Sequence, residues 1–213
     1  MNDIDIKNII FDFGGVIMDL HIQRVKEEFL ALGGSVELFP KQYSQFEGIF
    51  QLIDRGEMSI PQFYDAVREQ GRIPHATDAQ IRDAWLSLLG PIQEERLRTL
   101  LRLKERVNLY ILSNANALHW DYIEHTLMRY RGEDVNKWFK RIFLSYEMHL
   151  EKPEPEIYQA VIREAGLIPQ QSLFIDDSEL NTTAAAAQGF NTLHSINGDW
   201  VPILTAKFLD KEA

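Results

Sequence analysis

The sequence predicts an α/β fold, in which a Rossmann-like core with a parallel sheet carries an inserted α-helical cap of four helices. Two observations lead to this fold class. Short apolar runs alternate with amphipathic helical patterns over most of the chain, and a stretch without strand patterns separates the first apolar run from the others. Alternation of strands with helices is typical of βαβ units, which build a parallel sheet.

Five apolar runs are the predicted strands of the core. Each is short, almost continuously apolar and followed by a turn or by polar residues, as in strands that are covered on both faces. They span residues 8–13, 107–113, 142–145, 172–176 and 190–194. Because the first strand needs the later ones to complete a sheet, the segment between them is an insertion. We therefore assign residues 1–18 and 92–213 to the core and residues 19–91 to the cap.

Helical patterns fill the segments between the strands. In the core we expect one helix that starts at Pro91 and two that span residues 155–165 and 179–188, each closed by a glycine. In the cap, the predicted helices span residues 22–32, 41–53, 59–70 and 77–89. Ser59 and Thr77 are the expected N-caps of the last two, because their hydroxyls can accept hydrogen bonds from the free N–H groups of a first turn.

Composition and charge exclude several classes of protein. The 213 residues are 45% hydrophobic and 25% charged, which is an ordinary globular composition. The net charge is −10 and the basic residues form no stripe, so we expect no nucleic-acid partner. The absence of cysteine excludes disulfides, thiolate metal sites and cysteine nucleophiles. Neither a secretory signal nor a membrane span is predicted, so we expect a cytoplasmic monomer or homodimer without a membrane partner.

Polar residues follow four of the predicted strands. Ligands of an open parallel sheet bind outside the carboxyl ends of its strands, so these residues are expected to face one crevice. They are Asp12, Ser113, Asn114, Lys152, Asp176 and Asp177. Each of them alone has an ordinary structural reading, such as a turn residue, a helix cap or a surface lysine, but their joint occurrence favours a site.

The charged members of this set suit the cleavage of a phosphate monoester. The carboxylate of Asp12 can attack phosphorus and form an aspartyl-phosphate, which divides one difficult hydrolysis into two easier steps. Mg²⁺ prefers a few carboxylates together with water, and Asp12 and Asp177, helped by Asp176, can supply them. Lys152 is expected to neutralise the charge of the nucleophile and of the phosphoryl group.

The uncharged donors are expected to surround the phosphoryl oxygens. The hydroxyl of Ser113 and backbone N–H groups near Gly14, Gly15 and Asn114 can donate to these oxygens. Asn116 is a further candidate for contact with the substrate. The expected partner is therefore a small phosphorylated metabolite.

Four segments resemble the motifs of a known family. FDFGGVI, LSNAN, EKPEP and FIDDSELN, in this order, resemble motifs one to four of the haloacid dehalogenase-like hydrolase superfamily. The helical insertion after the first motif resembles the C1-type cap of that superfamily. The first motif and the segment DRGEMS most resemble the branch of sugar-phosphate phosphatases that act on hexose 1-phosphates.

The resemblance implies a role for each motif residue. Asp12 is the nucleophile and a metal ligand, Ser113 binds phosphate with Asn114 beside it, and Lys152 is the stabilising lysine. Magnesium is held by Asp12, by Asp177 and, through water, by Asp176. The backbone carbonyl of Gly14 is a further metal ligand.

Position 14 departs from the family pattern. Most phosphatase members carry an aspartate there as general acid/base, whereas Gly14 has no side chain. General acid catalysis contributes about 10²–10⁴-fold, so its loss matters for a poor leaving group. We therefore hypothesise a preference for sugar 1-phosphates, such as hexose 1-phosphate, or similar activated esters, because an anomeric hydroxyl is a more acidic leaving group than a plain alcohol. Asp19 or a water molecule are candidates for a replacement acid.

Other functions fit parts of the pattern. A metal-independent 2-haloacid dehalogenase would use Asp12 on carbon, but it gains nothing from the extra anions of Asp176 and Asp177. A phosphomutase must return a proton to the sugar, and Gly14 weakens that reading. A phospho-accepting receiver carries its acid pair at the first strand instead of the fourth. A catalytically weak phospho-binding or interaction domain is separated from the enzyme by turnover of p-nitrophenyl phosphate.

Overall fold

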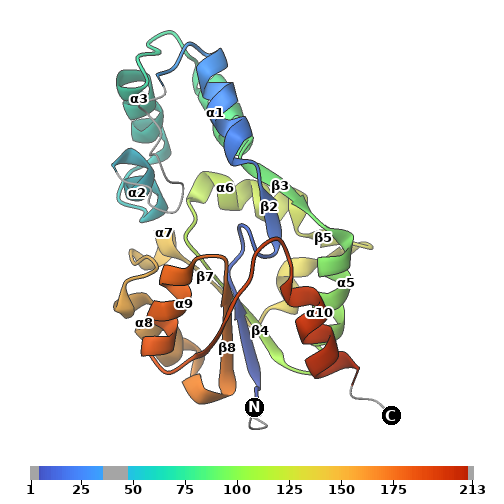
Figure 1. Ribbon diagram of the computed structural model, residues 1–213. Coiled ribbons are helices and arrows are strands. Elements are labelled where there is room, and N and C mark those ends of the chain that lie inside the picture. The colour runs from blue at the N-terminus through green and yellow to red at the C-terminus, as the bar shows by residue number, and fades with distance from the viewer. Residues whose placement is uncertain (1–4, 36–47, 211–213) are drawn as a thin grey trace.

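The computed structural model describes residues 5–35 and 48–210, and its centre is a five-stranded parallel sheet (Figure 1). The strand order is β7-β4-β1-β8-β9. The strands are β1 (Asn8–Phe11), β4 (Asn108–Ser113), β7 (Arg141–Leu144), β8 (Ser172–Asp176) and β9 (Asn191–His194). All four pairings are parallel, and each strand overlaps one of the five predicted runs. The predicted fold class is confirmed.

Helices cover both faces of this sheet, as Figure 1 shows. Helices α5 (Glu94–Leu103) and α10 (Trp200–Leu204) lie on one face, and α8 (Pro155–Ala165) and α9 (Glu179–Ala187) lie on the other. Successive residues of a strand point to opposite faces. Phe11 accordingly packs edge-on against Trp200 with 5.0 Å between ring centroids, while Ile10 belongs to the cluster under α8 and α9. The central strands are thus buried on both faces.

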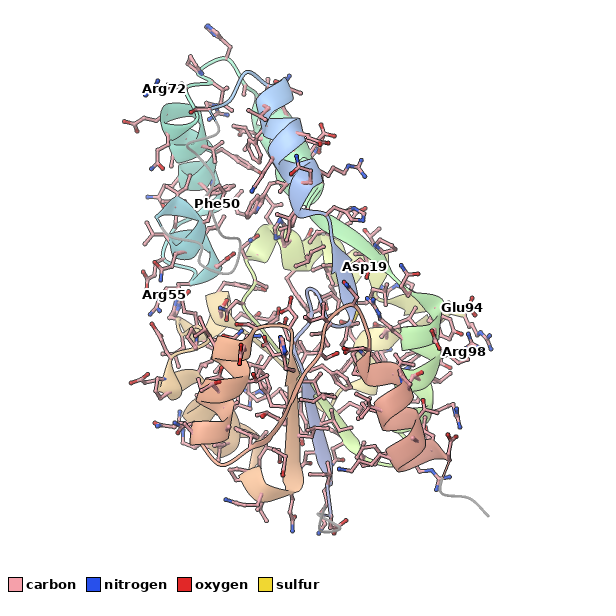
Figure 2. The ribbon with its side chains drawn as sticks, in the orientation of Figure 1. Asp19, Phe50, Arg55, Arg72, Glu94 and Arg98 are labelled. Carbon is pink, nitrogen blue, oxygen red and sulfur yellow. The ribbon has the colours of Figure 1, made fainter. Side chains whose placement is uncertain are left out.

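A group of helices stands above the carboxyl ends of the strands and forms the cap (Figure 1). Its described helices are α1 (Ile22–Ala31), α2 (Ile49–Asp54), α3 (Ile60–Gln70) and α4 (Asp78–Leu86). They have an aromatic core of their own around Phe50, which is labelled in Figure 2. Phe50 stacks on Trp85 with 4.8 Å between ring centroids and meets Phe63 edge-on at 5.9 Å. The predicted helical cap therefore has a separate hydrophobic core, while the domain limits at residues 18/19 and 91/92 stay a prediction.

The predicted N-caps of two cap helices are confirmed. The Ser59 side chain accepts a hydrogen bond from the backbone N–H of Gln62, and the Gln62 side chain binds the Ser59 backbone in return. Thr77 and Gln80 form the same capping box at α4. Each box satisfies two N–H groups that have no partner inside the helix, which stabilises the helix start by about 1 kcal/mol.

Several predicted boundaries differ from the structure, and three of the differences lie where a short element was missed. Pro91 does not start a helix, because it belongs to β3 (Leu89–Ile92), which pairs with β2 (Met18–Leu20) as an antiparallel ribbon. The helix expected over 77–89 ends at Leu86 for the same reason. The third core strand ends before Ser145, where α7 (Ser145–Met148) begins.

Short elements complete the described chain. Helix α6 (Ala117–Tyr122) follows β4 and leads into a small ribbon of β5 (Arg129–Tyr130) and β6 (Glu133–Asp134). Of the predicted helix 41–53, residues 41–47 lie outside the described residues, and the described part is α2. Within residues 5–35 and 48–210, the helices are too short or too polar to cross a membrane.

Candidate active site

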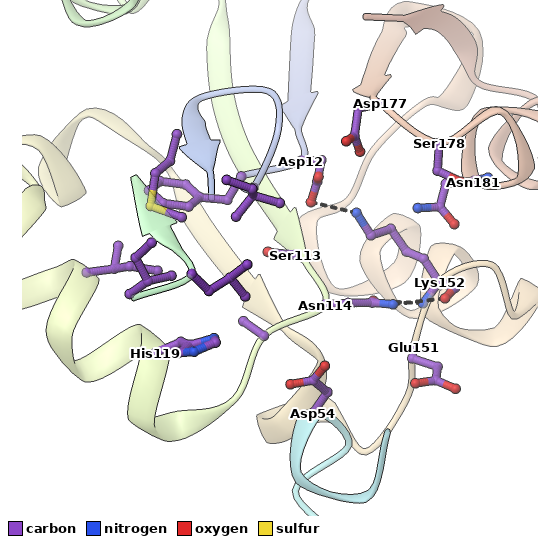
Figure 3. Close-up of a pocket in the computed structure, with 18 of the residues that line it drawn as sticks. Asp12, Asp54, Ser113, Asn114, His119, Glu151, Lys152, Asp177, Ser178 and Asn181 are labelled. Carbon is purple, nitrogen blue, oxygen red and sulfur yellow. Dashed lines mark hydrogen bonds and ion pairs between the residues drawn. The ribbon is translucent and has the colours of Figure 1, made fainter. Parts of the chain in front are cut away.

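The carboxyl ends of three neighbouring strands bring the predicted acid and hydroxyl groups together. Asp12 follows β1, and its N–H donates to the carbonyl of Ile175 at 2.8 Å, which extends the pairing with β8 by one residue. Ser113 ends β4 and Asp176 ends β8, on either side of β1. Neighbouring strands lie about 4.8 Å apart, so side chains at these positions meet. A cavity of about 640 Å³ opens beside them, between core and cap (Figure 3).

Lys152 links the two acidic strand ends. Its Nζ donates to Oδ1 of Asp12 at 2.7 Å (Figure 3). It also donates to Oδ2 of Asp176 at 2.6 Å. The side chain is 2% exposed. Burial by itself would lower the pKa of Lys152, but the charges of Asp12 and Asp176 raise this pKa above its ordinary value. The group is therefore an ammonium ion at the end of the cavity.

The surroundings of Asp12 disfavour the ionised form of its carboxyl group. Burial, together with the charges of Asp176 and Asp177, raises its pKa to about 7, although Lys152 acts in the opposite direction. Burial and Asp176 likewise raise the pKa of Asp177. One ammonium thus faces three carboxylates, and the protein on its own does not balance their charge.

The three carboxylates have the spacing of a cation site. Asp12, Asp176 and Asp177 each offer an oxygen, and these oxygens lie within 4.8 Å of one another. Oxygen ligands that leave room for water are the donor set that Mg²⁺ prefers. The residues therefore fit the predicted magnesium ion, which would also neutralise the charge that raises the pKa of Asp12.

Asp176 is held more firmly than the other two acids. Besides the bond from Lys152, its Oδ1 accepts from the backbone N–H of Ser178 at 2.8 Å and from Nδ2 of Asn181 at 3.0 Å. Both oxygens are thus engaged by the protein. This arrangement agrees with the expectation that Asp176 acts on the metal through water, whereas Asp177 lies more exposed at the cavity wall.

Gly15 allows the first motif to approach Asp177 closely. Its φ is +79°, and a Cβ atom at this position would lie 2.3 Å from Oδ2 of Asp177. Gly14 lines the cavity, and a Cβ there would come within 3.2 Å of Leu20. Leu20 therefore occupies the space beside the position where the resemblance leads one to expect an acid.

Known proteins resemble this chain over most of its length. The model of haloacid dehalogenase-like hydrolases matches residues 6–189. This chain belongs to the haloacid dehalogenase-like hydrolases. A D-ribitol-5-phosphate phosphatase of Bacteroides thetaiotaomicron is 32% identical, over 94% of this chain and 97% of the relative. A phosphorylated carbohydrates phosphatase of Thermotoga maritima is 23% identical, over 89% and 86%.

A solved structure agrees with the fold. A variant of a haloacid dehalogenase-like family enzyme from Bacteroides thetaiotaomicron, in complex with magnesium and inorganic phosphate, has a TM-score of 0.88. It is 36% identical and covers 93% of this chain and 98% of its own. The predicted superfamily and hydrolase class are confirmed. Both curated relatives carry the name of phosphatases, the enzyme class that the sequence predicts for this chain.

The structure gives the two asparagines of the second motif different surroundings. The side chain of Asn114 binds the backbone of Lys152, accepting from its N–H and donating to its carbonyl at 2.9 Å each (Figure 3). The side-chain amide of Asn114 therefore positions Lys152. The predicted contact of Asn114 with phosphate is one of its backbone N–H, which this pair of bonds does not involve. Asn116 is fully buried and is not among the residues that line the cavity. It caps α6 by accepting from the N–H of His119, so the structure does not support its predicted contact with substrate.

Two charged residues of the predicted cap segment, Asp19 and Arg55, pair with side chains of the core. Asp19 accepts from Arg96 at 2.7 Å and from Gln93 at 2.6 Å, outside the cavity wall (Figure 2). It is therefore a poor replacement for the acid that this hydrolase lacks at Gly14. Arg55 pairs with Glu154 at 2.7 Å and so joins the cap to the core.

The sequence did not reveal the wall of the cavity that faces the phosphate end. Gln51 and Asp54 reach it from α2, and Glu151 and His119 reach it from the core. Gln51 donates to Glu151, so this wall is built jointly by cap and core. No periodic pattern marks these residues, although Asp54 is the first residue of DRGEMS. Their position depends on how the cap docks.

Proposed function

We propose that this hydrolase is a Mg²⁺-dependent phosphatase that cleaves small phosphate monoesters through an aspartyl-phosphate on Asp12. One observation carries the proposal. Lys152 holds Asp12 at the end of a cavity, beside carboxylates that fit a divalent cation and opposite a cap that offers further polar groups. The two curated relatives, whose names give phosphorylated carbohydrates as substrates, support it.

The first half-reaction transfers the phosphoryl group to Asp12. Lys152 fixes the carboxylate through Oδ1, so that Oδ2 can attack phosphorus. The new bond from oxygen to phosphorus forms as the ester bond breaks, and the leaving alkoxide takes its proton from a water molecule, which is balanced when the attacking water of the second half-reaction gives one up. Ser113 donates its hydroxyl to a phosphoryl oxygen and Lys152 neutralises charge that develops there. Bound Mg²⁺ would add Lewis-acid polarisation of the phosphoryl group.

The second half-reaction regenerates the carboxylate. A water molecule attacks phosphorus, the bond from Asp12 to phosphorus breaks, and inorganic phosphate is released. The cap limits the access of water to the cavity during the first step, which favours transfer to Asp12 over direct hydrolysis.

Phosphorylated sugars and polyols are the substrate class that we propose. The hypothesis of hexose 1-phosphate rests on the missing side chain at Gly14, whereas the ribitol phosphate of the Bacteroides relative is a primary ester without an anomeric carbon. A comparison of kcat/KM for glucose 1-phosphate, glucose 6-phosphate and ribitol 5-phosphate decides between these leaving groups. Equal turnover of both glucose phosphates contradicts a preference for position 1.

The test of the phosphatase is turnover of p-nitrophenyl phosphate. We expect activity with Mg²⁺, loss of activity in EDTA, and a fall in kcat of at least about 10³-fold in Asp12→Asn, which cannot form the acyl phosphate. Asparagine keeps an oxygen for the bond from Lys152, so the fold is retained. Asp83→Asn, in a surface pair with Arg82, is the matched control and keeps wild-type turnover.

The alternatives give different results in this assay. A dehalogenase would release halide from a 2-haloacid in EDTA and leave p-nitrophenyl phosphate intact. A catalytically weak phospho-binding domain would bind phosphate without turnover in any condition. The cytoplasmic location and the monomeric or homodimeric state stay predictions, the latter to be measured by light scattering.

A further inference from the structure

Asp54 is a carboxylate in the cavity that the phosphate chemistry does not use. It is the last residue of α2, and Figure 3 shows it on the opposite side of the cavity from Asp12 and Asp177. Oδ1 accepts a hydrogen bond from Nδ2 of Asn116 at 2.8 Å. Within residues 5–35 and 48–210, Oδ2 has no hydrogen-bond partner, which leaves an acceptor for a ligand.

The fold itself gains little from a negative charge at this position. A carboxylate at the carboxyl end of a helix faces the negative end of the helix dipole. Burial raises the pKa of Asp54 to about 7, and the nearby carboxylate of Glu151 adds to this effect. A neutral asparagine would keep the bond to Asn116 without this unfavourable charge. A perturbed acid in a cavity is therefore a candidate for contact with a ligand.

The groups around Asp54 do not supply a compensating charge. Burial lowers the pKa of His119 to about 4, so the ring is neutral, and it is held between the carbonyl of Trp85 and Asn116. Arg55, the next residue, directs its guanidinium to Glu154, away from Asp54. The charge of Asp54 is thus available to a ligand.

The walls of the cavity differ in chemistry. One wall carries the polar side chains Asp54, Gln51 and Glu151. Apolar side chains also line the cavity, and besides the aromatic Phe13 and Trp85 they include Met18, Leu20, Ile22, Leu88, Leu89 and Ile123. A carbon chain that carries hydroxyl groups fits a lining of this kind, because its C–H groups can pack on apolar side chains while its hydroxyls reach polar ones.

We propose that Asp54 binds hydroxyl groups of the alcohol portion of the substrate and thereby selects phosphorylated polyols and sugars over alkyl phosphates. This inference rests on the phosphatase function proposed above. An ionised carboxylate accepts short, strong hydrogen bonds from hydroxyls, and its protonated form can also donate one. Asp54 is therefore a specificity-determining residue, while the phosphate end of the cavity treats both classes of ester alike.

Two matched substrates test this inference. Ribitol 5-phosphate and pentyl phosphate are both primary esters of a five-carbon chain, and they differ in their hydroxyl groups. We expect wild-type kcat/KM to favour ribitol 5-phosphate by at least about tenfold, since hydrogen bonds to charged groups contribute about 10–100-fold. In Asp54→Asn this preference should fall by about tenfold or more, mainly through KM for ribitol 5-phosphate.

The control variant is Asp65→Asn, which removes an exposed cap carboxylate that pairs with Arg68 on α3. It lies outside the cavity wall and should keep the wild-type ratio of the two substrates. Asn at position 54 retains an oxygen for Asn116, and circular dichroism checks the fold of the variant.

Three results overturn the inference. The first needs no variant: equal kcat/KM of the wild-type enzyme for ribitol 5-phosphate and pentyl phosphate contradicts the inference. An equal loss on both substrates in Asp54→Asn would mean that the residue acts on the leaving oxygen or on the fold, and wild-type kinetics on both substrates would mean that it contacts no hydroxyl. Failure of the phosphatase proposal is distinguishable, because wild type would then not turn over p-nitrophenyl phosphate.

Discussion

At the scale of single residues, Lys152 connects the stability of the core with the chemistry of the site. Its ammonium lies between Asp12 and Asp176 and is almost completely buried. Removal of one partner from a buried ion pair leaves an uncompensated charge, which destabilises a protein far more than loss of a surface pair.

We predict that Lys152→Met lowers the free energy of unfolding by about 3–5 kcal/mol in EDTA, because two buried carboxylates lose their counter-ion. Urea unfolding at pH 7.5 measures it. Lys7→Met is the control, since Lys7 meets Asp5 at 3.7 Å with both side chains more than half exposed, and its effect should stay below about 1 kcal/mol. Similar losses in both variants would contradict a buried ion network.

A second prediction at the residue scale concerns Gly15. Gly15→Ala places a Cβ where Oδ2 of Asp177 lies, so Asp177 must move away from the other carboxylates. We expect the Mg²⁺ concentration for half-maximal activity to rise by about tenfold or more, as for loss of a metal-positioning contact.

The control for this variant is Gly33→Ala. Gly33 has a similar φ of +86° but nothing within 4 Å of an added Cβ, so it shares the backbone strain without the clash. Its Mg²⁺ requirement should equal that of wild type. If both alanine variants shift the Mg²⁺ requirement alike, the effect comes from strain and not from Asp177.

Single residues also show what a sequence can predict about a site. Asp12, Ser113, Lys152, Asp176 and Asp177 are predicted to meet because they follow parallel strands, whose carboxyl ends lie at one edge of a sheet. The partners of Asn114 and Asn116 were not predictable, since they depend on side chains from other elements. The amide of Asn116 reaches Asp54 because the end of α2 in the cap lies beside the start of α6 in the core.

At the scale of elements, the junction of cap and core depends on α2 and the loop before α8. Arg55 binds Glu154 at 2.7 Å and Glu151 at 3.5 Å, and its carbonyl is within 2.9 Å of Nδ1 of His149. Figure 2 shows Arg55 at the lower end of the cap. The pair is partly shielded from solvent, because the Arg55 side chain is 19% exposed whereas that of Glu154 is 40% exposed.

We predict that Arg55→Ala lowers the free energy of unfolding by about 1–2 kcal/mol, because it removes several charge-assisted hydrogen bonds at once. Arg82→Ala, which removes the exposed pair with Asp83, should change it by less than about 0.5 kcal/mol. Both are measured by urea unfolding. Equal effects would show that Arg55 does not hold the cap.

Elements with strong local signals were predicted well. The capping boxes at Ser59 and Thr77 lie within four residues of sequence, so the sequence alone identifies these helix starts. The ribbon of β2 and β3 was missed, because its strands are very short and contain Gly90 and Pro91. Such pairings form through tertiary proximity, which local patterns do not encode.

At the scale of the whole molecule, the raised pKa values of Asp12, Asp54 and Asp177 link stability to pH and to metal. The folded protein without metal binds protons more tightly than the unfolded chain at these groups. Stability from this source is therefore highest below the unfolded pKa of about 4 and falls as pH rises towards about 7, where Asp12 ionises.

We predict that Mg²⁺ reverses part of this trend, because it binds the ionised carboxylates of the folded state. The rise in Tm caused by saturating Mg²⁺ over EDTA should be larger at pH 7.5 than at pH 5.5, as measured by thermal unfolding. Asp54 titrates in both conditions, so the difference between Mg²⁺ and EDTA isolates the metal site. A gain that is independent of pH would contradict binding at Asp12 and Asp177.

The overall architecture followed from the order of strands and helices, since five parallel strands and an inserted helical segment allow few arrangements.

The path of the chain into and out of the cap has a consequence of its own. Leu20 and Leu89 are partners in the ribbon of β2 and β3, so the chain leaves the core and returns to it at adjacent points. A different lid could be grafted between these two residues without altering the strand order beneath. Evolution or protein engineering can thus replace the cap, which contacts the alcohol portion of the substrate in our proposal, while the residues that act on the phosphate stay unchanged.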